Sequence, residues 1–266
     1  MNDDLVFENP ITPRPISKSE ARKARRKEKQ KKAQGSAGPL TARSQNQSLY
    51  LAALRAGQSI FAVGPAGTGK TLLPARIAAR RLADGVIDKI VLSRVTASKP
   101  QHKLGFLPGK LDAKMRPWLI PIFDGIKAEV GSALLDQWLQ DGRVEIAAFE
   151  HMRGRTFGNV PTFVLLDEAQ NADFGDLRLF LTRMGEDAQC VITGDLEQID
   201  IPNSGLERVI GIGKRHDVGM TFIEFTEKDV VRSPLTAAWV RAFAAELRGD
   251  VENLDHLPTF LHSQSH

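Results

Sequence analysis

One stretch of eight residues constrains the fold of this chain more than any other. It reads GPAGTGKT over residues 64–71 and fits the pattern G-x-x-x-x-G-K-[ST]. The apolar run IFAV precedes it, and a helical pattern follows from Leu72. In a strand–loop–helix of this kind, glycines let backbone N–H groups turn toward phosphate oxygens, and the helix N-terminus favours negative charge. The stretch therefore predicts an α/β fold with a phosphate-binding loop at a strand end.

The side chains of this loop have separate expected roles. Lys70 can reach the β and γ phosphates of a nucleoside triphosphate, and the Thr71 hydroxyl can ligate Mg²⁺. The residues expected to surround the phosphates are Gly64, Pro65, Ala66, Gly67, Thr68, Gly69, Lys70 and Thr71. The loop thus predicts binding of a triphosphate together with its metal.

Composition places the chain among globular proteins. Hydrophobic residues make up 42% of its 266 residues and charged residues 26%, which is ordinary for a soluble domain. No apolar run approaches the roughly 18 residues that cross a bilayer, and the acidic start MNDDLVFENP lacks the parts of a signal peptide. The single cysteine, Cys190, lies in an apolar run, so we expect it in the core of a cytoplasmic protein.

The positive charge is concentrated in the first 32 residues, which carry ten Lys or Arg against five Asp or Glu. The rest of the chain carries 26 basic and 27 acidic residues. Since residues 17–32 contain no large apolar side chain, we expect a disordered basic arm over 1–40, a folded domain over 41–250 and a tail over 251–266. The arm either contacts RNA or DNA phosphates or only keeps the protein soluble.

Strand-length apolar stretches alternate with helix-length stretches after this arm. Strands are expected at residues 59–63, 89–95, 144–149, 162–166, 189–193 and 221–225. Helices are expected at residues 45–55, 70–83, 113–130, 132–140, 173–184 and 234–248. Several strands are continuously apolar, as is typical of parallel strands covered on both faces. The alternation predicts a doubly wound α/β domain, with a mostly parallel sheet and helices on both faces.

Two carboxylates follow the apolar strand expected at 162–166. Asp167 is placed to hold Mg²⁺, commonly through water, and Glu168 to orient or deprotonate an attacking water. Paired carboxylates at the end of a buried strand are costly unless they meet a cation, although Asp167 could also serve as a helix N-cap. The pair favours hydrolysis of the bound triphosphate.

A polar segment, TGDLEQ at 193–198, follows the next apolar strand. Gln198 is the candidate for contacting the γ-phosphate, with Asp195 as its supporting partner. The segment comes third in order, after the phosphate-binding loop and the Asp167–Glu168 pair. That order favours a role in sensing whether the γ-phosphate is present.

Further blocks in the same order resemble the PhoH-like family, which is similar in turn to the motor domain of superfamily 1 helicases. The blocks are GPAGTGKT (64–71), LGFLPGK (104–110), MRGRTF (152–157), LLDEAQN (165–171), FLTRMG (180–185), TGDLEQID (193–200) and DVVRSP (229–234). The resemblance covers residues 43–245, and LGFLPG and MRGRT are more specific to this family than the phosphate-binding loop. It implies a RecA-like P-loop ATPase domain.

The resemblance also implies roles that the loop alone does not. Gln47 looks like the family's adenine-contacting glutamine, and ATP is favoured over GTP because no N-K-x-D motif is present. Arg94 and Arg232 match positions where the family carries arginines near phosphates. Arg232 could stabilise transition-state charge across a subunit boundary, while either arginine could instead form a surface ion pair.

Two features depart from a simple pattern. Pro74 lies in the helix after the loop and cannot donate a backbone hydrogen bond to the carbonyl of Lys70, so the first turn could be kinked.

The segment 100–141 interrupts the alternation of strands and helices. Its aromatic residues form either an intersubunit or nucleic-acid surface or the core of a helical cap. These aromatic residues are Trp118, Phe123 and Trp138. Arg153 and Arg155 either contact nucleic acid or phosphate, or anchor the fold.

The sequence therefore predicts an ATPase that uses Mg²⁺, with Lys70, Glu168, Gln198 and Arg232 as its catalytic residues. The basic arm and the helicase-like blocks favour a link to RNA metabolism, with RNA or another single-stranded nucleic acid as partner. A lone motor domain needs a second surface for mechanical work, so a role as an RNA-linked motor implies a homo-oligomer such as a ring. The alternative is a nucleotide-dependent binding module or switch that controls a protein partner. A P-loop small-molecule kinase is a more distant possibility.

Overall fold

The fold is that of a computed structural model in which residues 37–96, 115–149, 152, 154–231, 235, 236, 238, 239, 242, 243 and 245 are described. All of them lie within one compact unit that spans residues 35–266. Most of the expected arm, the block at 104–110, Arg153, Arg232 and the expected tail lie outside the described residues.

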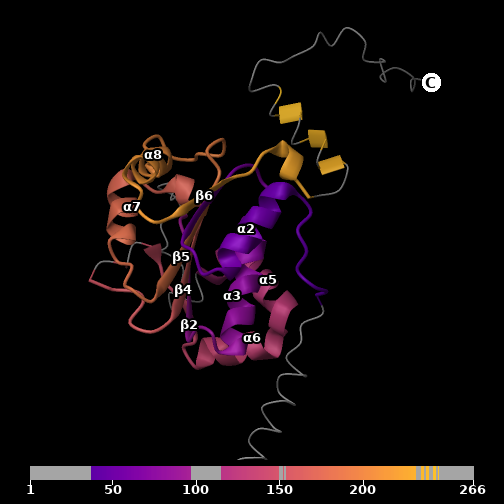
Figure 1. The fold of residues 1–266 in the computed structure, drawn as a ribbon, viewed down its shortest axis with the longest axis vertical. Helices are drawn as coiled ribbons and strands as arrows, with labels where there is room; N and C mark the ends of the chain where they lie inside the picture. Colours follow the sequence, from indigo (N-terminus) through magenta and orange to yellow (C-terminus); the bar gives the residue numbers. More distant parts are fainter. Residues whose placement is uncertain are drawn as a thin grey trace, which may run out of the picture. The chain divides into compact units, whose positions relative to one another are not determined.

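Six strands form one sheet in the order β3-β2-β4-β5-β1-β6 (Figure 1). They are β1 (Ile60–Val63), β2 (Lys89–Arg94), β3 (Val144–Ile146), β4 (Thr162–Asp167), β5 (Ala188–Gly194) and β6 (Thr221–Glu224). Every pairing between them is parallel, and each strand lies where the sequence predicts one. The predicted α/β fold is confirmed. β5 separates β1 from β4, so the strand before the phosphate-binding loop does not pair with the strand that ends at Asp167.

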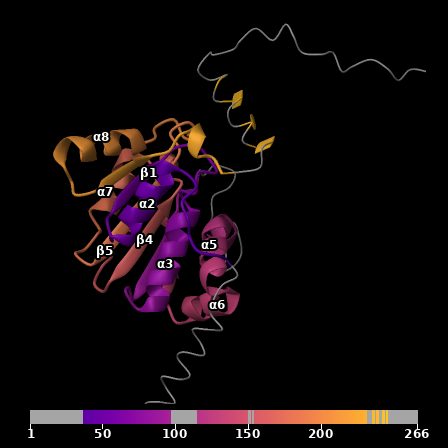
Figure 2. The ribbon, with the colours of Figure 1, turned by 45° about the vertical axis from the view of Figure 1, so that its right-hand side comes forward.

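Helices cover both faces of the sheet (Figures 1 and 2). They are α2 (Gln45–Arg55), α3 (Leu72–Asp84), α5 (Ile120–Val130), α6 (Ser132–Gln140), α7 (Phe174–Leu181) and α8 (Leu206–His216), with short 3-10 turns η3 (Arg116–Leu119), η5 (Ala169–Asn171) and η6 (Glu227–Asp229). α2, α3, α5 and α6 lie on one face and α7 and α8 on the other. Within the described ranges, no helix is long and apolar enough to span a membrane.

The two faces of the sheet build two apolar cores because strand side chains alternate. Ile60 and Ala62 of β1 pack with α2, α3 and α5, whereas Phe61 and Val63 pack with α7 and α8. Cys190 belongs to the second core, as predicted, and its burial raises the pKa of the thiol to about 12. The continuous apolar character of the strands therefore reflects burial on both sides.

Helix α8 is absent from the elements that the sequence predicts. Its sequence LERVIGIGKRH contains two glycines, which lower helix propensity by about 1 kcal/mol each. One of them has a packing reason, since a methyl group on Gly213 would come within 2.8 Å of the Phe222 ring. α8 nevertheless buries Leu206 and Val209 against the second core, and this burial outweighs the weak local propensity.

The described part of segment 100–141 forms a helical layer over α3. Phe123 and Trp138 are buried at 6% and 2% exposure, while Trp118 is 48% exposed. The expectation of aromatic residues in the core of a cap therefore holds for two of the three. α5 lies close against α3, since a methyl group on Gly125 would come within 2.8 Å of the Cβ of Ala75. Gly125 thus lets α5 approach the helix that follows the phosphate-binding loop.

Residues 37–40, which precede α2, are hydrogen-bonded to α5, α3 and α2. The amide of Ala37 donates to Ala128 O at 3.2 Å, and Arg76 donates to Gly38 O at 2.8 Å. Arg55 donates to Leu40 O at 3.1 Å. The last residues of the stretch expected as an arm are therefore bonded to the domain.

Candidate nucleotide-binding site

The carboxyl ends of four neighbouring strands bring the predicted polar residues together. β1 leads into residues 64–71, β2 ends at Arg94, β4 ends at Asp167 and β5 ends at Gly194. The strand register pairs Arg94 with Asp167 and Val63 with Gly194, so these ends lie level. Ligands of open parallel sheets bind at this edge.

The glycines of the phosphate-binding loop have backbone conformations that other residues rarely adopt. φ is +136° at Gly64, +87° at Gly67 and +91° at Gly69. Gly64 is also sterically required, since a methyl group there would lie 2.3 Å from the carbonyl oxygen of Phe225. The glycine pattern is therefore explained by the shape of the loop.

Side chains of the loop close it on itself. The ammonium of Lys70 donates to the carbonyl of Gly64 and, at 2.8 Å, to that of Pro65. Thr68 Oγ1 also donates to Pro65 O at 3.0 Å. Lysine has three N–H donors and no acceptor, so Lys70 faces the inside of the loop with a group that suits phosphate oxygens.

Pro74 leaves one carbonyl at the start of α3 without its backbone donor, and a side chain of α2 supplies a donor instead. The amides on either side of Pro74 donate to the carbonyls on either side of Lys70, at 3.0 and 3.4 Å. The Lys70 carbonyl itself accepts from the Tyr50 hydroxyl of α2 at 3.0 Å. Burial, and secondly the negative charge of Asp167, raises the pKa of Tyr50 well above its ordinary value, so the hydroxyl keeps its proton. Helical hydrogen bonding thus continues past Pro74.

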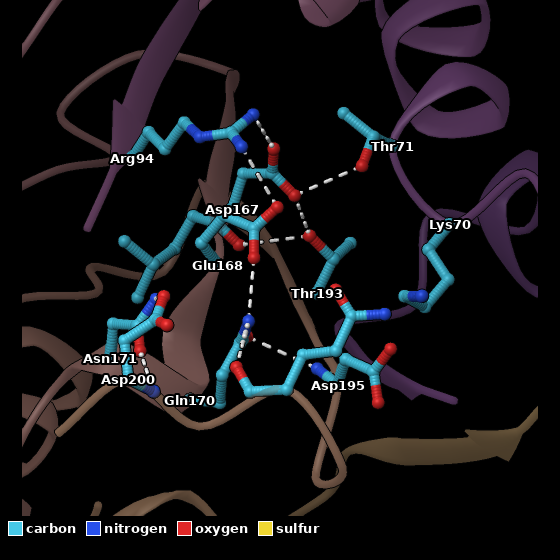
Figure 3. Close-up of polar contacts among 12 residues, drawn as sticks. Lys70, Thr71, Arg94, Asp167, Glu168, Gln170, Asn171, Thr193, Asp195 and Asp200 are labelled. Atoms are coloured by element: carbon cyan, nitrogen blue, oxygen red, sulfur yellow. Dashed lines mark hydrogen bonds and ion pairs between the residues drawn. The ribbon is translucent and has the colours of Figure 1, made fainter. Parts of the chain in front are cut away.

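Asp167 is the most strongly held carboxylate of the site (Figure 3). One oxygen, Oδ1, accepts from Thr71 Oγ1 at 2.9 Å and from Thr193 Oγ1. The other, Oδ2, accepts from Arg94 Nη1 at 3.0 Å. The side chain is buried, and these partners come from the loop, β5 and β2. Its contacts are those of a site residue rather than of a helix N-cap.

Glu168 lies beside Asp167 with an unusual backbone conformation. Its φ of 57° and ψ of 39° are left-handed, which is uncommon for a residue other than glycine and is found at functional sites. Glu168 Oε1 accepts from Arg94 Nη2 at 2.9 Å, and Oε2 accepts from Gln170 Nε2 at 2.6 Å. Arg94 therefore bridges the predicted metal ligand Asp167 and the predicted catalytic carboxylate Glu168.

A cavity of about 480 Å³ brings most of the predicted residues to one space. Its lining includes Ala66, Gly67, Gly69, Lys70, Thr71, Leu72, Arg94, Pro121, Asp167, Glu168, Gly194, Asp195, Gln198 and Val231. The volume falls in the range of small-molecule sites, about 300–1,000 Å³. Pro121 and Val231 extend the site to α5 and to the segment after β6.

Among the described residues, four predicted site residues do not line this cavity: Gln47 and, in the loop, Gly64, Pro65 and Thr68. Gln47 is buried, and its amide donates to Thr68 O at 3.0 Å and accepts from Arg43 N at 2.9 Å. Its adenine contact stays a prediction. Arg232 lies outside the described residues, although its neighbour Val231 donates from its amide to Gly67 O at 2.9 Å. The role of Arg232 also stays a prediction.

Sequence reasoning missed three side chains of the site. Thr193 and Gln170 lie inside the sequence blocks quoted above, but nothing in those blocks shows which residues their side chains contact. Thr193 bonds to Asp167, and Gln170 bonds to Glu168. Tyr50 belongs to no motif. The only signal for it in the sequence is Pro74, which indicates that the Lys70 carbonyl lacks its usual backbone donor.

Arg155 of the MRGRTF block pairs with Glu145 of β3, and its guanidinium carbon lies 5.0 Å from the Phe157 ring centroid. These contacts favour an anchoring role.

Comparison with known proteins identifies the family of this chain. The sequence profile of the family described as PhoH-like protein matches residues 39–244. The chain belongs to the PhoH-like family. The PhoH-like protein of Bacillus subtilis (strain 168) is 40% identical over 204 residues, which is 76% of this chain and 63% of that protein. Protein PhoH of Escherichia coli (strain K12) is 36% identical over 211 residues, which is 77% of this chain and 58% of that protein.

This PhoH-like chain spans between 58% and 63% of the length of these curated relatives. Among solved structures, it is similar to the Pif1 helicase from Candida albicans at 17% identity and a TM-score of 0.39, over 77% of this chain and 44% of that one. Family membership and the strand–loop–helix of the site together establish a P-loop nucleotide-binding fold.

Proposed function

We propose that this PhoH-like domain binds ATP with Mg²⁺ and hydrolyses it to ADP and phosphate. The observation that carries the proposal is the meeting of Thr71 with Asp167 at 2.9 Å, in the cavity that Lys70 and Glu168 also line. Hydroxyl, carboxylate, ammonium and a second carboxylate are the groups that phosphoryl transfer to water requires. They come from the loop and the end of β4, as the order of motifs along the chain implies.

Thr71 and Asp167 would hold the metal. No group of three or more His, Cys, Asp or Glu side chains suited to a metal occurs among the described residues. A hydroxyl and one carboxylate fit Mg²⁺, because this ion takes one or two protein ligands and completes its shell with phosphate oxygens and water. When bound, Mg²⁺ would neutralise charge on the phosphates.

Glu168 would act on the water. It would accept a proton while the water oxygen bonds to the γ-phosphorus and the bond to the leaving oxygen of ADP breaks. Lys70 would stabilise the phosphate charge, and Gln198, which lines the cavity, would contact the γ-phosphate. Arg232 would add positive charge from a neighbouring subunit, and Gln47 would contact adenine.

A link to RNA and to an oligomer is the second part of the proposal. The ten basic residues among the first 32 support binding to nucleic-acid phosphates. Leu235, Trp239 and Phe243 recur every four residues and are 71%, 56% and 62% exposed, which supports a surface that another subunit covers. The same exposed surface also favours the alternative, a nucleotide-dependent switch that controls a protein partner.

ATP binding and phosphate release, measured with and without RNA at fixed salt, test the proposal. Lys70→Ala should abolish binding or turnover, and Glu168→Gln should bind ATP with near-normal affinity and lose turnover at least 100-fold. Full turnover by Glu168→Gln would refute the role of Glu168. RNA stimulation that disappears when residues 1–40 are deleted would support the RNA link, and stimulation that survives the deletion would exclude the arm as its cause.

A further inference from the structure

Gln170 connects the general-base candidate Glu168 to the loop after β5 (Figure 3). Its Nε2 donates to Glu168 Oε2 at 2.6 Å and to the carbonyl of Gln198 at 3.2 Å. Its Oε1 accepts from the amide of Asp195 at 3.1 Å. The residue is only 1% exposed.

These partners fix which way the amide of Gln170 points. The Asp195 amide is a donor and can meet only the carbonyl oxygen of Gln170, while a carboxylate and a backbone carbonyl can meet only its NH₂ group. Both N–H donors and the oxygen are therefore used, and a flipped amide would leave every contact unsatisfied. The side chain has one orientation that serves both the carboxylate and the loop.

The two oxygens of Glu168 are consequently held by different parts of the protein. Arg94, at the end of β2, holds Oε1 at 2.9 Å, and Gln170 holds Oε2. Since Gln170 is bonded at the same time to Asp195 and Gln198, the Oε2 contact depends on where the loop after β5 lies. Gln198 lines the cavity, so this loop borders the space available to a ligand.

We propose that Gln170 is a positioning residue that couples the orientation of Glu168 to the loop at 195–198. A shift of this loop in response to the γ-phosphate would move the Gln170 amide and, through it, the carboxylate that acts on water. The coupling makes turnover depend on the loop without requiring the loop to touch the water itself. This inference rests on the proposed ATPase function and adds a regulatory contact to it.

Asn171 supplies a matched control. It joins the same two segments, since Asn171 Nδ2 donates to Asp200 Oδ2 at 3.3 Å and the Asp200 amide donates to Asn171 Oδ1 at 3.0 Å. None of these contacts involves Glu168. Asn171→Ala therefore removes a link between the turn and the loop while leaving the Gln170–Glu168 contact in place.

The first test measures kcat and KM for ATP, the Kd for ADP and thermal unfolding of the full chain. Gln170→Glu keeps an acceptor for Asp195 and loses both donations. We expect kcat to fall at least 20-fold, with KM and the ADP Kd within threefold of wild type, while Asn171→Ala keeps kcat within threefold. A kcat of Gln170→Glu within twofold of wild type, or an equal loss in Asn171→Ala, would overturn the proposal.

A second measurement needs no turnover. Amide hydrogen exchange is compared between ADP and a non-hydrolysable ATP analogue. In wild type the analogue should change exchange both at 195–200 and at 168–171, whereas in Gln170→Glu it should change only 195–200. If 168–171 responds alike in both proteins, the coupling is refuted. A wild type that binds ATP without hydrolysing it would refute the ATPase function alone, since the exchange experiment still decides the coupling.

Discussion

The hydroxyl of Tyr50 donates a hydrogen bond of 3.0 Å to the backbone carbonyl of Lys70. Tyr50 is the single tyrosine of the chain and is fully buried in α2, where its ring meets that of Phe225 edge-on at 5.5 Å. In an ordinary helix the amide four residues after Lys70 would make this bond, but that residue is Pro74. A side chain from another helix thus replaces a backbone donor at Lys70 of the P-loop.

Tyr50→Phe should destabilise the protein only because residue 74 is proline. The change leaves the Lys70 carbonyl without its donor, which we expect to lower the free energy of unfolding by about 1–2 kcal/mol. Pro74→Ala restores an N–H group, so Tyr50→Phe in the Pro74→Ala background should cost less than half as much. Urea unfolding of the four proteins measures both penalties. Equal penalties in the two backgrounds would show that Tyr50 does not substitute for the missing amide.

Thr193→Val should weaken activation by Mg²⁺. The Thr193 hydroxyl is fully buried and donates to Asp167 Oδ1, so its loss removes one of the groups that orient the carboxylate proposed to hold Mg²⁺. We expect the Mg²⁺ concentration at half-maximal ATPase rate to rise about tenfold or more, in the range of metal-site support residues. Thr193→Ser keeps the hydroxyl and serves as the control. A matching rise in Thr193→Ser would mean that the methyl group, not the hydroxyl, matters.

Arg94→Lys should reduce turnover although it keeps the positive charge. The guanidinium donates through separate nitrogens to Asp167 and Glu168, and a lysine ammonium lacks this fixed fork. We expect kcat to fall at least tenfold. Arg143→Lys, which replaces an arginine that contacts Trp138 and the carbonyl of Leu82, should leave kcat near the wild-type value. Steady-state kinetics at saturating Mg²⁺ compares the two, and an unaffected Arg94→Lys would argue against the bridge.

Asp229→Asn should lower the thermal stability of the protein at neutral pH and change how that stability depends on pH. Burial alone would raise the pKa of Asp229, but hydrogen bonds from Ser44, Thr226 and Asn46 outweigh it and hold the pKa below its ordinary value. A carboxyl whose pKa is lowered by folding stabilises the fold above its unfolded pKa, about 3.9, and loses that contribution as the pH falls through the folded value.

Wild type should therefore unfold at a higher temperature than Asp229→Asn at pH 7, and the difference should shrink as the pH drops below about 4. Thermal unfolding between pH 7 and pH 3 measures it. A difference that stays constant across this range would indicate that the charge on Asp229 is not responsible.

The strands were predictable because their burial leaves a direct trace in the sequence. The run Thr162–Asp167 is buried throughout and apolar from Phe163 to Leu166, so the strand and the carboxylate at its end are visible together. Helix α2 has the ends predicted from its helical pattern, and the structure shows that Ser44 caps its start by accepting from the amide of Gln47. Helix α8 was not predicted, because its two glycines lower the local helix propensity, and the close packing of Gly213 against Phe222 of β6 becomes visible only in the fold.

The sequence predicts which residues form the site better than it predicts the hydrogen bonds between them. The P-loop, Asp167 and Glu168 each follow from residue type and order along the chain. The bond of Tyr50 to Lys70 and that of Gln170 to Glu168 depend on side-chain directions that only the packed helices and strands determine. No periodicity encodes them.

The amide of Val231 donates to the carbonyl of Gly67, and the carbonyl of Phe225 fills the space beside Gly64. The backbone of the P-loop is therefore shared with the segment at 225–231, which leads directly to Arg232 in the sequence. If a partner that restrains this segment changes the affinity for nucleotide, then nucleotide must change the affinity for that partner by the same factor, because coupling between two sites is reciprocal.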